Sequence, residues 1–321
     1  YTPVPSVVTG GKKLKFDGGY VLELEWDMLT IKTPEKLLFP KSGDKAFKDH
    51  EFFEASSMRK YEGKYYFVYS SRHNHELCYA VSESPTEGFR YGGTLVSNGD
   101  VFLNGQADEN YACNYIGNTH GGMLRLGEKF YIFYHRQTNR SSYARQACAE
   151  ELKKLPDGSF IQAEMTSCGL NAGPLIGKGT YGARIACNLW SAQGTGRYDG
   201  SSPAKRLREH PYFTQDKRDG DTSARQYIAN MQDGAVAGVK YFDIQNLTRI
   251  SVTIRGRADG SMEIATDSKF QNRIGSIFIR TDDKEWKTFS DFVETENGIH
   301  PLYFRFKGQG KLDFLEFKLM I

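Results

Sequence analysis

Short alternations of apolar and polar residues dominate the chain, and patterns of helical period are weak throughout. Period-two runs rich in aromatic and β-branched residues, divided by glycine-rich turns, are typical of β-strands. In the second half such runs predict strands at residues 250–254, 262–264, 277–279, 302–306 and 314–320. The turns predicted to separate them include Asp259-Gly260, Gly298 and Gly308-Gln309-Gly310. The best helix candidate, residues 148–154, continues a strand, so the pattern predicts an all-β chain.

An aromatic strand pattern occurs twice in the first half. Lys64-Tyr-Tyr-Phe-Val-Tyr69 recurs 65 residues later as Lys129-Phe-Tyr-Ile-Phe-Tyr134. Each copy follows a glycine-containing turn and a strand-like stretch, and each precedes a further strand, at residues 77–81 and 143–148. A unit of several antiparallel strands repeated every ~65 residues is typical of a β-propeller. Two hairpins of an ordinary β-sandwich would give the same local pattern, so that alternative stays open.

A change in residue composition and hydrophobic pattern near residue 178 predicts a domain boundary. Residues 172–182 are rich in glycine and weakly patterned, as linkers are. We expect a first domain at residues 1–178, which contains the repeat, and a second at residues 179–321, a β-sandwich of the jelly-roll type. Residues 191–224 are polar with few apolar anchors, and they predict a long loop.

Composition excludes several classes of protein. With 39% hydrophobic residues and no apolar run near ~20 residues, the chain is neither disordered nor predicted to span a membrane. Its 42 Lys and Arg and 39 Asp and Glu are interspersed, which argues against binding of nucleic acid. Five cysteines without Cys-x-x-Cys spacing argue against a disulfide framework or zinc site and favour a reducing compartment. No signal peptide is recognisable, and the compartment is left open.

Glu54 and His120 occupy the same place in consecutive repeats, at the start of a strand. In a propeller the first strand of each blade lines the central channel, so both side chains would point toward the axis. Glu54 follows Phe52-Phe53, and desolvation by aromatic neighbours would raise its pKa and suit it to general acid catalysis. The alternatives are a partly solvated rim carboxylate and a hydrogen-bonded structural histidine.

These residues carry a resemblance to glycoside hydrolase family 43. The similar stretches are residues 52–57 with 64–71, residues 117–122 with 133–136, and Arg145 ahead of Asp157-Gly158. The resemblance covers residues 1 to about 178. It implies the five-bladed propeller of β-xylosidases, α-L-arabinofuranosidases and arabinanases. The chain would supply the end of blade two and blades three to five, a partial propeller of about three blades.

The resemblance implies roles for three residues. Glu54 stands at the position of the general acid. His120 stands at the channel centre, where an ion or water is often bound, and Arg145 stands where an arginine contacts the sugar near the cleaved bond. The alternative for Arg145 is a surface salt bridge. No cofactor is implied to be required, although a calcium ion at the propeller centre near His120 would fit the resemblance.

The chain departs from that family because two of the family's catalytic aspartates have no match in it. The general base and a second aspartate that tunes the acid would lie upstream of residues 1–5, and no aspartate here, Asp27 and Asp49 included, matches their motifs. We therefore expect a missing N-terminal propeller portion, in the same or a separate polypeptide. The implied reaction is inverting hydrolysis of xylan- or arabinan-derived oligosaccharides. The alternative is a non-catalytic carbohydrate-binding or structural protein.

Residues 182–321 resemble carbohydrate-binding module family 6. The similar stretches are residues 233–242, 255–260, 286–289 and 298–304. Ala186 and Asn188 replace acids that help to hold calcium in that family, and Leu312 and Phe289 replace an asparagine and a tryptophan that bind sugar. We therefore favour a structural role over sugar binding for this domain, with the apolar surface near Trp190 packed on the propeller.

Overall fold

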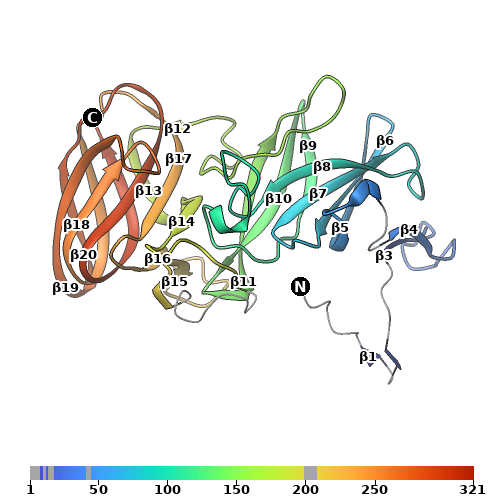
Figure 1. Cartoon of the computed structure of the whole chain (residues 1–321), viewed down its shortest axis with the longest axis horizontal. Coiled ribbons are helices and arrows are strands. Elements are labelled where there is room, and N and C mark those ends of the chain that lie inside the picture. The colour runs from blue at the N-terminus through green and yellow to red at the C-terminus, as the bar shows by residue number, and fades with distance from the viewer. Residues whose placement is uncertain (1–7, 10–11, 14–17, 41–44, 199–207) are drawn as a thin grey trace. The chain divides into compact units, whose positions relative to one another are not determined.

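The computed structural model describes residues 8–9, 12–13, 18–40, 45–198 and 208–321 (Figure 1). Over these residues the chain is built of β-strands, with only short helical turns such as Lys45–Phe47, Glu109–Tyr111 and Ala183–Ile185. The predicted all-β class is therefore confirmed. None of the described helices has the length and apolar character to cross a lipid bilayer.

The chain forms two compact units, each made of several stretches of sequence. The first combines Tyr1–Ser97, Asn118–His135 and Glu151–Ala163. The second combines Asn98–Gly117, Arg136–Glu150 and Glu164–Ile321. Because both units are discontinuous, the boundary expected between residues 178 and 179 stays a prediction.

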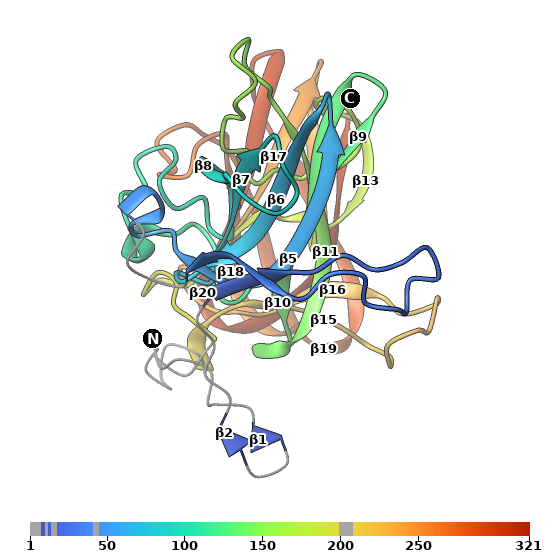
Figure 2. The same ribbon diagram turned by 90° about the vertical axis from the view of Figure 1, so that its right-hand side faces the viewer.

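A four-stranded antiparallel sheet forms the main part of the first unit. Its strands follow one another in sequence order: β5 (Phe52–Tyr61), β6 (Lys64–Ser71), β7 (Glu76–Ser82) and β8 (Arg90–Ser97) (Figure 2). Glu62 and Gly63 join β5 to β6 with φ values of 51° and 80°. Positive φ at both central residues gives a turn whose twist matches that of the flanking strands.

The second copy of the repeat forms a three-stranded sheet of β9 (Gly122–Leu126), β10 (Lys129–Thr138) and β11 (Ser141–Leu152). The two hairpins have the same register: Met58 pairs with Phe67 in the first, and Met123 pairs with Ile132 in the second. Of the helix candidate at residues 148–154, residues 148–152 belong to β11. The repeat therefore consists of antiparallel sheets of the predicted blade type.

Smaller strand pairs precede these sheets. They are β1 (Val8–Thr9) with β2 (Lys12–Lys13), and β3 (Gly18–Val21) with β4 (Lys36–Pro40). The apolar core of the first unit contains Phe47, Phe67, Tyr69, Cys78 and Ala80. Residues 1–5, expected to end blade two, lie outside the described part of the chain.

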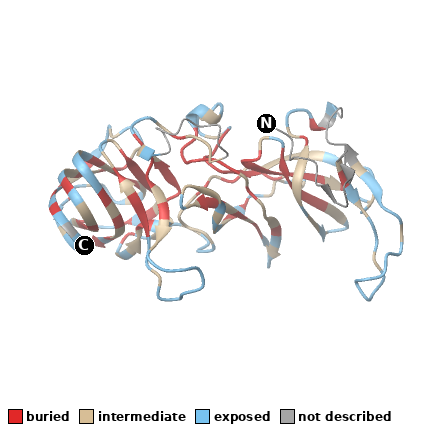
Figure 3. Cartoon of the chain, turned by 90° about the horizontal axis from the view of Figure 1, so that it is seen from below, coloured by how far each residue is buried: buried red, intermediate tan, exposed pale blue. Residues whose placement is uncertain are grey.

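The β-sandwich of the second unit contains nine strands that are joined by hydrogen bonds. Its strands are β12 (Leu175–Ile176), β13 (Gly179–Gly182), β14 (Asn188–Trp190), β15 (Tyr212–Gln215), β16 (Gln226–Met231), β17 (Val236–Ile244), β18 (Arg249–Ala265), β19 (Arg273–Phe292) and β20 (Gly298–Met320). Buried and exposed positions alternate along the long strands (Figure 3). Their buried side chains form one large core that includes Phe242, Ile250, Val252, Phe304 and Phe317.

The turns predicted at Asp259-Gly260 and Gly308–Gly310 are wrong. Both stretches lie inside continuous strands, where Gly260 pairs with Gly308 and Ala258 pairs with Gly310. A Cβ atom on Gly260 would lie 2.2 Å from the carbonyl oxygen of Lys307, and one on Gly310 would lie 2.1 Å from that of Arg257. This close approach of two strands requires glycine at these positions. From the sequence alone, such glycines look the same as the glycines of a turn.

The loop predicted at residues 191–224 is also wrong in part. Strand β15 lies within it and pairs with β16, with Phe213 opposite Ile228. Phe213 is a buried member of the sandwich core and one of the few apolar anchors in this polar stretch. Residues 199–207 of the predicted loop lie outside the described residues.

Candidate functional site

Glu54 is the third residue of β5, at a place where the strand is irregular. The register against β6 shifts both before and after Glu54. The next residue, Ala55, has φ of +65°, in the left-handed region that alanine rarely adopts. Bulges re-aim side chains and are frequent beside active sites, and such strain persists only where the surroundings hold it. The local backbone therefore gives Glu54 a direction that a regular strand would not.

His120 lies two residues before the start of β9 and is held by its neighbours on both sides. The backbone N–H of Thr119 donates to the carbonyl oxygen of Asn74 at 3.0 Å, and its hydroxyl donates to that of His135 at 3.0 Å. A Cβ atom on Gly121 would lie 1.8 Å from a carbonyl oxygen of β10. Only glycine fits there, so the chain is pinned closely against β10 immediately after His120.

The structure brings Glu54 and His120 into direct contact. Nε2 of His120 lies 2.8 Å from Oε1 of Glu54, and the side chains are 34% and 37% exposed. Within the described residues the second carboxylate oxygen of Glu54 has no hydrogen-bond partner. The ring of His135 meets that of His120 edge-on, with centroids 5.3 Å apart. The pair is thus fixed on one side and open to solvent on the other.

This arrangement suits proton transfer. One oxygen of Glu54 is oriented by the imidazole, while the other is free to meet a substrate oxygen at hydrogen-bond distance. A carboxyl group held in this way can donate a proton to a leaving group without first breaking a protein contact. The assignment of Glu54 as the general acid stays a prediction.

The described donors around His120 do not complete a calcium site. Calcium takes six to eight oxygen ligands, whereas His120 is contacted here by one carboxylate and a second imidazole. Among the described residues, the groups of three side chains placed to hold a metal do not include His120. A calcium ion near His120 stays a prediction, and no step below is routed through it.

A second histidine–glutamate pair lies in the same unit and was not predicted. Nδ1 of His50 lies 2.7 Å from Oε1 of Glu76, whose side chain is fully buried. The hydroxyl of Ser71 donates to the same carboxylate oxygen at 2.5 Å, and that of Thr94 donates to the other at 3.0 Å. The ring of His50 stacks on Tyr91 with centroids 5.1 Å apart. Both oxygens of this carboxylate are therefore hydrogen-bonded to protein groups.

The buried pair is ionised on both sides. Burial alone would raise the pKa of Glu76, but the hydrogen bond and charge of His50 lower that pKa to about 2. Burial likewise opposes the charge on His50, yet Glu76 raises the pKa of the imidazole above its usual value. The two groups therefore form a salt bridge that a substrate cannot reach.

Cys78 lies beside this pair, and its sulfur completes a group of three that could hold a metal. Burial raises the pKa of the Cys78 thiol well above its usual value, so the thiol stays protonated. Its sulfur lies 3.6 Å from the hydroxyl of Thr94. Metal ligation at this group would need a thiolate and a free carboxylate oxygen. The group offers neither, so we interpret it as a salt bridge.

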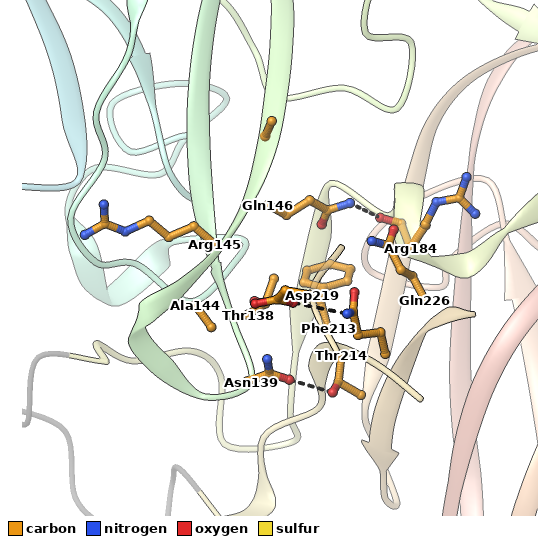
Figure 4. Close-up of a pocket in the computed structure, with 12 residues that line it drawn as sticks. Thr138, Asn139, Ala144, Arg145, Gln146, Arg184, Phe213, Thr214, Asp219 and Gln226 are labelled. Atoms are coloured by element: carbon orange, nitrogen blue, oxygen red, sulfur yellow. Dashed lines mark hydrogen bonds between the residues drawn. The ribbon is translucent and has the colours of Figure 1, made fainter. Parts of the chain in front are cut away.

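Arg145 belongs to the second unit, where it is exposed on β11. It lines a cavity of about 240 Å³ together with residues that include Gln146, Arg184, Phe213 and Thr214. In Figure 4 the guanidinium of Arg145 points away from Gln146, whose amide donates to the carbonyl oxygen of Arg184. Neighbouring residues of a strand face opposite ways, which accounts for this divergence. The predicted role of Arg145 beside a sugar stays a prediction.

Two aromatic side chains of the sandwich, Trp286 and Tyr227, are covered by an arginine. The guanidinium of Arg255 lies 4.4 Å from the ring centre of Trp286 and 4.8 Å from that of Tyr227. It also donates to Asp313 at 3.0 Å. Leu312, which replaces the sugar-binding asparagine, is buried in the core. One face of each ring is therefore occupied by Arg255, and the structural role favoured for this domain stays a prediction.

No family model matches the chain, but comparison with curated proteins finds clear relatives. A Thermoclostridium stercorarium protein named xylosidase/arabinosidase is 42% identical over 296 residues, which cover 91% of this chain and 62% of that protein. An arabinoxylan arabinofuranohydrolase of Paenibacillus polymyxa is 23% identical over 286 residues, covering 82% of this chain and 40% of that protein. The chain thus spans at most about 62% of the length of these two relatives.

Among solved structures, the chain is similar to a glycoside hydrolase family 43 arabinoxylan arabinofuranohydrolase from Bacillus subtilis. The TM-score is 0.48 and the identity is 19%, over 94% of this chain and 59% of that one. A family 6 carbohydrate-binding module from Clostridium cellulolyticum gives a TM-score of 0.35 at 13% identity, over 45% of this chain and 98% of that one.

Proposed function

We propose that this chain is part of a glycoside hydrolase that removes xylose or arabinose residues from hemicellulose oligosaccharides, with Glu54 as its general acid. The observation that carries the proposal is the Glu54–His120 contact, in which one carboxylate oxygen is held and the other is open. The 42% identity to a protein named xylosidase/arabinosidase supports the choice of substrate class.

In the proposed reaction Glu54 protonates the glycosidic oxygen as the bond to the sugar breaks. His120 holds the carboxyl group in position and supplies a partner for the carboxylate that remains. A second carboxylate, which we place outside these 321 residues, activates a water molecule on the opposite face of the sugar. In inverting enzymes the two carboxyl groups stand roughly 6.5–9.5 Å apart to admit that water. We propose that Arg145 contacts the sugar near the cleaved bond.

The small β3–β4 sheet supports the proposal that further propeller strands exist. An isolated two-stranded sheet is marginal in water, and this one exposes Tyr20, Leu37 and, at its hairpin tip, the fully exposed Trp26. Such a sheet gains an apolar partner if more strands add to it. We propose that the N-terminal propeller portion, in the same or a separate polypeptide, provides these strands and the base.

The test compares this chain with a longer protein in which the proposed N-terminal propeller portion is joined to it. Each is incubated with nitrophenyl xyloside, nitrophenyl arabinofuranoside and arabinoxylan oligosaccharides, and the released pentose is measured. We expect turnover by the longer protein and none by the 321-residue chain. Hydrolysis by the chain alone would show that its base lies within it. Absence of hydrolysis by both would favour a non-catalytic carbohydrate-binding protein.

A further inference from the structure

A cavity of about 370 Å³ lies in the second unit, apart from the residues given a role above. It is bounded by the segment from Asp100 to Cys113 on one side and by strands β14, β17 and β20 on the other. This size falls within the usual range of small-molecule sites. Its lining is polar and aromatic, and it contains Asp100, Asn110, Tyr111, Glu164, Trp190 and Lys240.

The floor of the cavity is a buried charge cluster. Nζ of Lys240 lies 3.2 Å from Asp100 and 2.7 Å from Glu164, and Asp100 and Lys240 are almost completely buried. Burial alone would lower the pKa of Lys240, but the negative groups around it raise that pKa, so the ammonium stays charged. Burial raises the pKa of Asp100, and the charge of Lys240 works against that rise. With both carboxylates ionised, one cation faces two anions, which leaves a negative balance at the floor.

Glu164 is the member of this cluster that faces outward, with 26% of its side chain exposed. Asn104 donates to it at 3.0 Å and the hydroxyl of Tyr241 donates at 2.9 Å. These contacts fix the carboxylate before any ligand arrives, and its oxygens keep lone pairs for a further donor. A preorganised carboxylate of this kind suits the hydroxyl groups of a sugar.

The mouth of the cavity carries aromatic rings and an amide. Trp190 lies half-buried with its ring 6.0 Å from that of Tyr303, and Tyr111 is 64% exposed. Over the described ranges no hydrogen bond is formed by the side chains of Asn110, Tyr111 or Trp190. Flat rings offer a platform for the C–H face of a sugar, and the unpaired amide offers both a donor and an acceptor.

We propose that this cavity binds a neutral pyranose unit of a xylo-oligosaccharide, as a site separate from the one that contains Glu54. The sugar ring stacks on Trp190, while its hydroxyls bond to Glu164 and Asn110. The net negative floor disfavours sugars that carry a uronate group. The choice of xylo-oligosaccharide rests on the proposed function, whereas the preference for a neutral sugar rests on the cavity itself.

The test follows the three indole N–H signals of the full 321-residue chain in nitrogen-15 NMR spectra. Each signal is assigned by a single Trp→Phe variant, and xylotetraose is titrated into the protein. We expect the Trp190 signal to move with saturation, while the signals of Trp26 and Trp286 stay in place. Trp190→Ala should weaken binding at least tenfold in calorimetry, and the matched variant of the fully exposed Trp26 should not.

Charge provides the second arm of the test. A uronate-bearing xylo-oligosaccharide of equal length should bind at least tenfold more weakly than xylotetraose. Glu164→Gln removes one negative charge, so it should narrow that difference. An unmoved Trp190 signal at millimolar xylotetraose, or equal binding of the acidic sugar, would overturn the proposal.

These binding readouts do not depend on catalysis. If the longer protein hydrolyses nothing while the Trp190 signal moves, the proposed function fails and this site stands. If hydrolysis proceeds while the signal stays in place, the site fails and the function stands.

Discussion

Two histidine–glutamate pairs in the first unit have nearly the same geometry and opposite surroundings. The contact distance is 2.8 Å in Glu54–His120 and 2.7 Å in His50–Glu76. The first carboxylate is 37% exposed and has one oxygen open, whereas the second is fully buried and bonded on both oxygens. Distance alone therefore does not identify a reactive carboxyl group. An open oxygen that substrate can reach distinguishes the pair that suits chemistry from the pair that suits stability.

On the proposed function, the largest effect should come from Glu54→Gln in the chain joined to its proposed N-terminal portion. The amide keeps the shape but cannot donate the acidic proton, so turnover of natural linkages should fall by roughly 10²–10⁴-fold. Nitrophenyl glycosides need less protonation and should lose less. Thermal melts should show that the variant remains folded. Equal losses on both substrate types would contradict the role of Glu54 as the acid.

Glu76→Gln should act on stability instead. It leaves the protonated His50 without its buried counter-charge, and breaking such a pair costs about 3–5 kcal/mol. Denaturant unfolding measures the loss, and the exposed Glu87→Gln, which breaks the surface pair with Lys36, is the matched control. That control should change the free energy of unfolding by less than about 1 kcal/mol. A Glu76→Gln variant as stable as the control would show that the buried pair is not structural.

His120→Ala should lower turnover by roughly tenfold or more, since a hydrogen bond to a charged group is worth about 1.5–3 kcal/mol. The pair is one-third exposed, so unfolding free energy should change little. The comparison is kcat against melting temperature in the same preparation. A steep fall in melting temperature with a proportionate loss of activity would make His120 a structural residue like His50.

The smallest expected effect is a pH dependence of stability from the buried pair. The pKa of Glu76 falls from 4.5 to about 2 on folding, so its contribution is present above pH 4.5 and lost as the pH falls toward 2. The pKa of His50 rises above 6.5 on folding, so its contribution is present below pH 6.5 and lost as the pH rises through the folded value.

The melting-temperature difference between the wild type and Glu76→Gln should therefore be widest between pH 4.5 and 6.5. Each kcal/mol of stability corresponds to about 2–4 °C in a unit of this size. The Glu87→Gln control should show no such maximum. A difference that stays constant from pH 3 to pH 9 would contradict the ionised state of the pair.

The sequence predicted that Glu54 and His120 point toward one axis, because a repeat places both residues at the same position. Their direct contact is seen only in the structure. It missed His50 and Glu76 because they share no repeat position. His50 precedes β5 and Glu76 begins β7, and β6 lies between these two strands in the sheet. Lys240 was missed for a similar reason, since it stands in an otherwise apolar strand pattern. Its partners Asp100 and Glu164 come from distant segments, and no local periodicity reports such a contact.

The wrong turns and the wrong loop in the predicted fold have different physical origins. Glycine marks both a turn and a place where two backbones touch, and only the partner strand decides between these. Gly256, Gly260, Gly308 and Gly310 belong to the second kind. Strand β15 was hidden by polar neighbours, because one buried phenylalanine anchors it to the sandwich.

The close approach of β18 and β20 at their glycines has a consequence for how the sandwich unfolds. β18 pairs along its whole length with both β19 and β20, from Arg249 at one end to Ala265 at the other. A protease or a pulling force that frees one end of β18 therefore meets the same two neighbours over the entire run. The strand cannot detach in halves, so backbone amides from one end of β18 to the other should exchange with deuterium at one common rate, as a single cooperative unit.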